Sequence, residues 1–76
     1  MEDKPLKTKD FYIIAMLKYH GIPILDITES GRIKTIHVDR TPEVKQLLLD
    51  YENGNIKVDI RTFIHAIEET KELVHR

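Results

Sequence analysis

The four histidines are the residues of this chain best suited to bind a metal ion or to move a proton. They are His20, His37, His65 and His75. No two of them stand four positions apart, the spacing that brings two imidazoles to one face of a helix around a zinc ion. The chain has no cysteine, so thiolate zinc ligands and disulfides are excluded. We therefore predict ordinary surface or helix-end positions for the histidines, and no metal site.

Acidic side chains gather near the C-terminus, where they could bind a cation or act as a general acid and base. Glu68, Glu69 and Glu72 stand there beside Lys71. No signal of a pocket accompanies them, which favours a solvated helix face. Ser30, the only serine, lies in a turn sequence, and the chain has no glycine-rich phosphate-binding motif. We predict that the protein is not an enzyme and uses no cofactor.

Basic side chains form the stronger chemical pattern, because they flank two segments that could hold a phosphate backbone. The set is Lys7, Lys9, Arg32, Lys34 and Arg40. Asp26, Glu29 and Asp39 dilute this charge locally, and the formal net charge of the whole chain is −1. A strongly basic domain is typical of nucleic-acid binding. Contact with nucleic acid is therefore the alternative hypothesis and not the leading one.

The elements that must position these residues begin with a helix over residues 11–19. Thr8 is its predicted N-cap, and Gly21 is its predicted stop. Apolar side chains cover nearly its whole circumference, which is typical of a helix buried on more than one side. A sheet can cover one side, and a second helix or a second copy of the chain must cover another.

Two strands are predicted next, over residues 22–28 and 33–38, because apolar and polar residues alternate there. The turn between them contains Gly31, which accepts a left-handed backbone. Helices must cover one face of this hairpin, because an isolated hairpin is marginal in water.

The cross-strand register of the hairpin stays open at this point. A two-residue loop at Ser30 and Gly31 pairs Leu25 with Ile36. A three-residue loop instead pairs Asp26 with Lys34.

A second helix starts at Thr41, with Pro42 at its first position, and ends before residues 53–55. Residues 56–58 form a short extended segment that could be a third strand. Asp59 then caps a final helix. The apolar positions of the second helix are Val44, Leu47, Leu48 and Tyr51, and those of the final helix are Ile60, Phe63, Ile64, Ile67 and Val74. Ala66 and Leu73 form a weaker second stripe.

This order of elements predicts an α+β fold with helices packed on a small antiparallel sheet in two layers. The 76 residues make a single domain over 1–76, and residues 1–7 are predicted to be a flexible N-terminal arm. No run of 18 apolar residues predicts a membrane span, and the start has no signal-peptide pattern. We expect a cytoplasmic protein with no membrane partner.

A pattern of residues runs through the chain: Lys7-Thr8-Lys9-Asp10-Phe11-Tyr12, then Gly21, Leu25-Asp26 and Gly31-Arg32. Thr35 to Asp39 and two later helices extend it over residues 7–75, nearly the whole chain. In this pattern the sequence resembles a family of small bacterial and phage proteins that is catalogued only as a domain of unknown function. Ile36 and Val38 depart from the aromatic residues that members tend to carry there. The resemblance implies small stand-alone proteins in phage or mobile-element neighbourhoods, and it brings no catalytic residues.

The leading functional hypothesis is a small non-catalytic accessory module that acts through protein–protein association. Residues 11–19 offer more apolar surface than so small a monomer can be expected to cover, and exposed apolar surface marks interfaces. The predicted partner is a second copy, as a homodimer, or a larger protein. The predicted association surface consists of Tyr12, Met16, Tyr19, Leu49 and Leu73.

Overall fold

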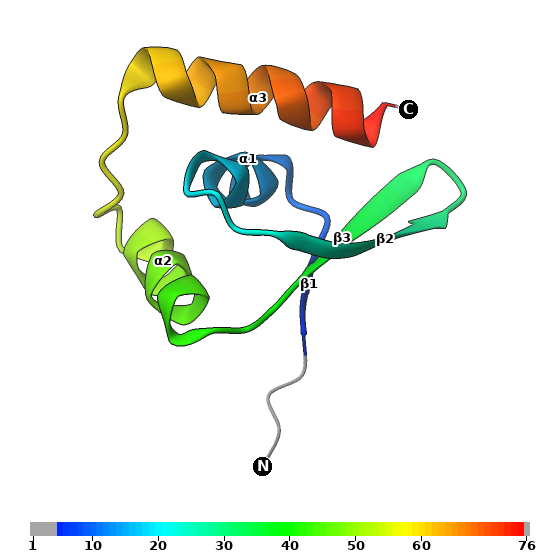
Figure 1. The fold of residues 1–76 in the computed structure, drawn as a ribbon, viewed down its shortest axis with the longest axis horizontal. Coiled ribbons are helices and arrows are strands. Elements are labelled where there is room, and N and C mark those ends of the chain that lie inside the picture. Colours follow the sequence, from blue (N-terminus) through cyan, green and yellow to red (C-terminus); the bar gives the residue numbers. More distant parts are fainter. Residues whose placement is uncertain (1–4, 76) are drawn as a thin grey trace.

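The computed structural model describes residues 5–75, which form three helices and a three-stranded antiparallel sheet (Figure 1). This confirms the predicted α+β fold. In chain order the elements are β1 (Leu6–Thr8), α1 (Phe11–Tyr19), β2 (Ile24–Ser30), β3 (Ile33–Val38), α2 (Pro42–Glu52) and α3 (Ile60–Val74).

The third strand of the sheet comes from the start of the chain. β1 pairs with β3, with Leu6 opposite Val38 and Thr8 opposite Ile36, so the strand order is β1-β3-β2. The prediction of a flexible arm over residues 1–7 is therefore wrong for residues 6 and 7, because β3 offers their backbone groups partners. Residues 1–4 of that arm lie outside the described residues. Residues 56–58, the other candidate strand, have no strand structure.

The hairpin of β2 and β3 adopts neither of the two registers left open by the sequence. Ile27 lies opposite Ile36 and Glu29 opposite Lys34, which leaves Gly31 and Arg32 as the loop. Gly31 has φ of 63°, while no non-glycine residue described has a positive φ. This fits a two-residue turn with glycine at its first position, as in type II′. The register also shifts near Leu25, as at a β-bulge.

The N-cap of α1 is Asp10, which corrects the prediction of Thr8. The Asp10 carboxylate accepts hydrogen bonds from the backbone N–H groups of Tyr12 (2.9 Å) and Ile13 (3.1 Å). Thr8 belongs to β1, and its hydroxyl accepts from the Asp10 N–H at 3.2 Å. At the other end of α1, Gly21 has φ of 71° and directly follows the C-cap residue, as predicted.

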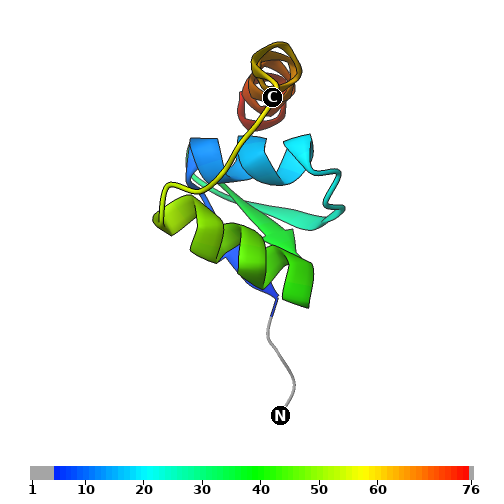
Figure 2. The same cartoon turned by 90° about the vertical axis from the view of Figure 1, so that its left-hand side faces the viewer.

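α1 lies between the sheet on one side and α3 on the other (Figure 2). Its residues Ile14, Ala15, Met16 and Leu17 are at most 2% exposed in a single copy of the chain. The prediction had allowed either a second helix or a second copy as cover. α3 supplies that cover, so the apolar circumference of α1 does not by itself require a dimer.

The main core forms where α1 meets β3 and the start of α2. Ile36, Val38 and Val44 are fully buried there, beside Ile14, Met16 and Leu17 of α1. Val44 reaches this position because α2 begins as predicted, with the Thr41 hydroxyl accepting from the Val44 N–H at 3.2 Å. Burial of this kind stabilises the fold by about 1.5–3 kcal/mol for each large aliphatic side chain.

α3 packs through only part of the predicted main stripe, because Phe63 and Val74 pack against the core. Ile60 and Ile64 are 66% and 46% exposed, whereas Ala66 and Thr70 are buried. Small residues let α3 approach α1 closely, and the Thr70 hydroxyl is satisfied by the Ala66 carbonyl at 2.7 Å. The weaker predicted stripe of Ala66 and Leu73 therefore lies on the packed side together with Phe63 and Val74. Ile60 and Ile64 of the predicted main stripe are exposed.

The start of α3 is fixed by Asp59, as predicted. Its carboxylate accepts hydrogen bonds from the backbone N–H (3.0 Å) and the hydroxyl (2.8 Å) of Thr62. These two bonds, the backbone one first, hold the pKa of Asp59 below its ordinary value of 3.8. The Asp59 N–H donates to the Tyr19 hydroxyl at 2.9 Å, which ties the start of α3 to the end of α1.

Candidate functional site

A groove with basic side chains opens beside the tip of the hairpin. Three separate parts of the chain line it: the start of α1, the tip of the β2–β3 hairpin and the end of α3. Figure 1 shows the hairpin tip and the end of α3 on the same side of the molecule. The groove has a volume of about 240 Å³. Its lining residues are Lys9, Phe11, Arg32, Ile33, Lys34, Val74 and His75.

Strand pairing explains why residues distant in sequence meet here. Because Thr8 at the end of β1 pairs with Ile36, the chain leaving β1 passes alongside the first residues of β3. Lys9 and Phe11 follow directly and reach the groove. The two-residue loop places Arg32 at the hairpin tip, next to Ile33 and Lys34.

Lys34 connects the hairpin to the last helix. It lies opposite Glu29 across the strands, and its Nζ atom donates to the Leu73 carbonyl at 3.2 Å. That carbonyl belongs to the last turn of α3, where the helix dipole is negative and favours a cation. Lys34 is half-buried, so its side chain holds the groove together while adding to its positive charge.

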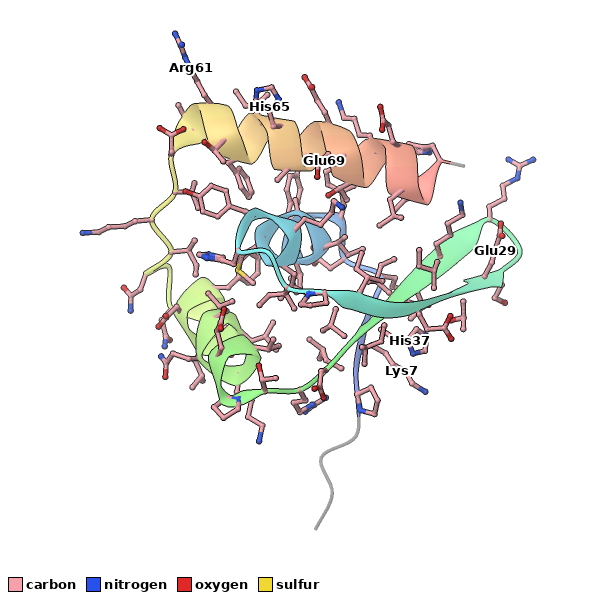
Figure 3. The ribbon with its side chains drawn as sticks, in the orientation of Figure 1. Lys7, Glu29, His37, Arg61, His65 and Glu69 are labelled. Carbon is pink, nitrogen blue, oxygen red and sulfur yellow. The ribbon has the colours of Figure 1, made fainter. Side chains whose placement is uncertain are left out.

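The remaining cations of the groove are exposed. Within residues 5–75, neither Lys9 nor Arg32 has a hydrogen-bond or ion-pair partner. A second hollow of about 220 Å³ adjoins the groove and shares Arg32 and Lys34 with it, and Glu29 adds one carboxylate to its lining. Figure 3 shows Glu29 near the hairpin tip. The rim therefore carries three full positive charges and one negative charge.

The floor of the groove is apolar. Phe11 and Val74 are half-buried, and Ile33 is 53% exposed. Sequence reasoning selected the basic residues here but missed these three and His75. The alternation of β3 marked Ile33 as a strand residue, but nothing in the sequence indicated that the end of α3 returns to the hairpin tip.

The groove contains three of the five predicted nucleic-acid contacts, namely Lys9, Arg32 and Lys34. Lys7 instead pairs with His37, and Figure 3 shows the two side chains next to each other, away from the groove. Arg40 follows β3 and is half-buried. The predicted basic set is therefore divided between the groove and two other places.

The predicted association surface is also divided. Tyr12 and Leu49 are exposed, at 59% and 53%. Met16 is 1% exposed and belongs to the core, and Leu73 packs against that core. Tyr19 is half-buried, with its ring 6.0 Å from that of Phe63. The prediction is therefore wrong for Met16, which is buried in the core, whereas Leu73 and Tyr19 contribute to packing within one copy and remain partly exposed.

A family model matches residues 3–75 of the sequence. The chain belongs to a family described as a domain of unknown function, DUF5659. The resemblance inferred from the sequence is thereby confirmed. The searches of curated proteins and of solved structures found no match to the chain.

The histidines and the acidic cluster were the other candidates for a binding or catalytic site. No group of three or more histidine, aspartate or glutamate side chains there could hold a metal ion. Of the acidic cluster on α3, Glu69 forms an ion pair with Lys18 of α1 at 3.6 Å. Of the helices over residues 5–75, none is long and apolar enough to span a membrane.

Proposed function

We propose that this protein is a small accessory module that acts by binding another protein, with a second copy of itself as the first candidate partner. The observation that carries the proposal is the pair Ile60 and Ile64. They stand one helical turn apart on α3, and they remain 66% and 46% exposed. Adjacent exposed apolar side chains favour an interface, whereas single ones are ordinary.

Other exposed apolar side chains support the same proposal. The set outside α3 is Tyr12, Leu25, Ile27, Ile33, Leu49 and Tyr51. Tyr12 and Leu49 belong to the predicted association surface. The proposal assigns this accessory role to the cytoplasm, as expected from the sequence, and to a phage or mobile-element setting, as the resemblance to small bacterial and phage proteins implies.

Light scattering across a concentration series tests the self-association. We expect the mass to rise from the monomer value of 8.9 kDa toward twice that value. Ile64→Glu and Leu49→Glu should each shift the transition to higher concentration, because a charge placed in an apolar contact is costly. His65→Glu is the matched control, since it adds the same charge beside Ile64 on an exposed, polar position. A strict monomer at high micromolar concentration, with no change of mass in either apolar variant, would rule out self-association.

Nucleic-acid binding is a second candidate, favoured by the convergence of Lys9, Arg32 and Lys34 in one groove. About three phosphate contacts predict a modest salt slope, near −2 for a single strand. The test is retention of a single-stranded oligonucleotide at low salt. The double variant Lys9→Glu with Arg32→Glu should abolish retention, whereas Lys57→Glu with Arg61→Glu changes the net charge equally outside the groove. Equal retention by both double variants would contradict a role for the groove.

A further inference from the structure

We propose that the groove is a docking site for an acidic protein segment that carries an apolar anchor residue. This inference rests on the proposed function, because it names the chemistry of a protein partner. The groove combines two features, a cationic rim and an apolar floor.

The rim provides the attraction for carboxylates. Lys9 and Arg32 are exposed, and no described residue pairs with either of them. Arg32 can bind a carboxylate in a bidentate manner, which adds direction to the attraction. Lys34 is held by the Leu73 carbonyl at 3.2 Å, and it adds a fixed positive charge between the hairpin and α3. A segment with several aspartate or glutamate residues complements this arrangement.

The floor provides a place for one apolar side chain. Ile33 is 53% exposed, and Phe11 and Val74 lie beside it as half-buried neighbours. The volume of about 240 Å³ is smaller than the roughly 300–1,000 Å³ of small-molecule pockets. The groove therefore fits a single anchoring side chain of a peptide better than a whole metabolite.

The same floor favours a protein partner over a nucleic acid. Single-stranded nucleic acids bind by stacking bases on aromatic rings. Ile33 and Val74 are aliphatic and offer no ring. Phe11 is half-buried, and its ring packs against that of Tyr12 edge to face, with centroids 5.4 Å apart.

The test is a fluorescence-anisotropy titration of the full chain with labelled probes, at low micromolar protein concentration. The principal probe is a short synthetic peptide of aspartate and glutamate residues around a central leucine. A second peptide has serine in place of that leucine, and a single-stranded oligonucleotide is the third probe. We expect the leucine peptide to bind most tightly, about tenfold tighter than the serine peptide, because the apolar anchor adds to the charge attraction.

Two matched pairs of variants locate the binding. Arg32→Glu should weaken binding of the leucine peptide by about tenfold or more, while Arg61→Glu, at the opposite end of α3 (Figure 3), should change it by less than about twofold. Ile33→Ser should remove the preference for leucine over serine, and Ile60→Ser should preserve it. All four side chains are exposed, so we expect each variant to fold as the wild-type chain does. The melting temperature of each variant checks this expectation.

Three results would overturn the inference. The first is tighter binding of the oligonucleotide than of the leucine peptide, which would favour the nucleic-acid candidate. The second is equal loss of peptide binding in Arg32→Glu and Arg61→Glu, which would indicate a charge effect without a site. The third is absence of peptide binding by a chain that still self-associates in light scattering, in which case the docking inference fails and the proposed function stands.

Discussion

The β2–β3 hairpin has isoleucine side chains of β3 both at its base and at its tip, and the two positions have opposite environments. Near the base of the hairpin, Ile36 and Val38 are fully buried against α1 and α2. Near its tip, Ile33, which lies opposite Ser30, is 53% exposed. Figure 1 shows that the hairpin extends past the ends of the helices, so of the helices only the ends of α1 and α3 approach its tip, at the groove.

This difference shows that an apolar side chain of the hairpin is buried only where a helix packs over it, and that the alternation of the strand does not decide this. At the base of the hairpin, apolar side chains stabilise the fold. At the tip, the Ile33 side chain remains available to a partner, and it lines the groove with the cations Arg32 and Lys34. We therefore expect substitutions at the base to change stability and substitutions at the tip to change binding.

The largest expected effect comes from shortening a side chain at the base. Ile36→Ala should lower the free energy of unfolding by about 3 kcal/mol, because it removes buried methyl groups and leaves a cavity. Ile33→Ala, the same change at the tip, should cost less than about 1 kcal/mol. Urea denaturation followed by circular dichroism measures both values. Similar losses in the two variants would show that the two halves do not differ in this way.

The division between base and tip could be predicted only in part from the sequence. Alternation correctly identified both strands, and Pro42 and Asp59 marked the starts of the two later helices. These signals are local, and local signals determine the type of each element. They contain no information on how far a neighbouring helix extends over a strand.

The candidate site was harder to predict for the same reason. Lys9, Arg32 and Lys34 were selected for their charge, which is visible in the sequence. Their meeting with Val74 and His75 depends on α3 crossing α1. At that crossing the packed face of α3 includes the small residues Ala66 and Thr70 beside Phe63 and Val74. The sequence pattern ranked the small residues second because larger apolar side chains dominated the predicted main stripe.

The next effect concerns the packing of α3 on α1, the helix that covers the base of the hairpin. Ala66→Leu should destabilise the fold by about 1–3 kcal/mol, because Ala66 is 5% exposed and a larger side chain would force α3 away from its neighbours. Ile64→Leu, two positions earlier and 46% exposed, is the control and should be nearly neutral. Thermal unfolding compares the two. A stable Ala66→Leu variant would mean that α3 is not closely packed at this position.

A smaller effect is expected at the tip itself. Gly31→Ala should cost about 1 kcal/mol, because φ of 63° at this position is unfavourable for a residue with a Cβ atom. No heavy atom lies within 4 Å of the added Cβ, so backbone conformation is the only cause. Gly31→Asn should cost less, since asparagine tolerates a left-handed backbone. Equal unfolding free energies for the alanine and asparagine variants would contradict this explanation.

The smallest effect is a pH dependence at the start of α3, far from the tip. The hydrogen bonds from Thr62 lower the pKa of Asp59 below 3.8, so the charged carboxylate is favoured in the folded state. Its contribution to stability is complete above pH 3.8, and it is lost as the pH falls through the lowered pKa. In Asp59→Asn the amide oxygen still accepts from the Thr62 N–H but does not titrate. The melting temperature of the wild-type chain should therefore exceed that of Asp59→Asn near neutral pH, and the gap should close in acid. A gap that stays constant across this range would show that the charge of Asp59 adds nothing to the cap.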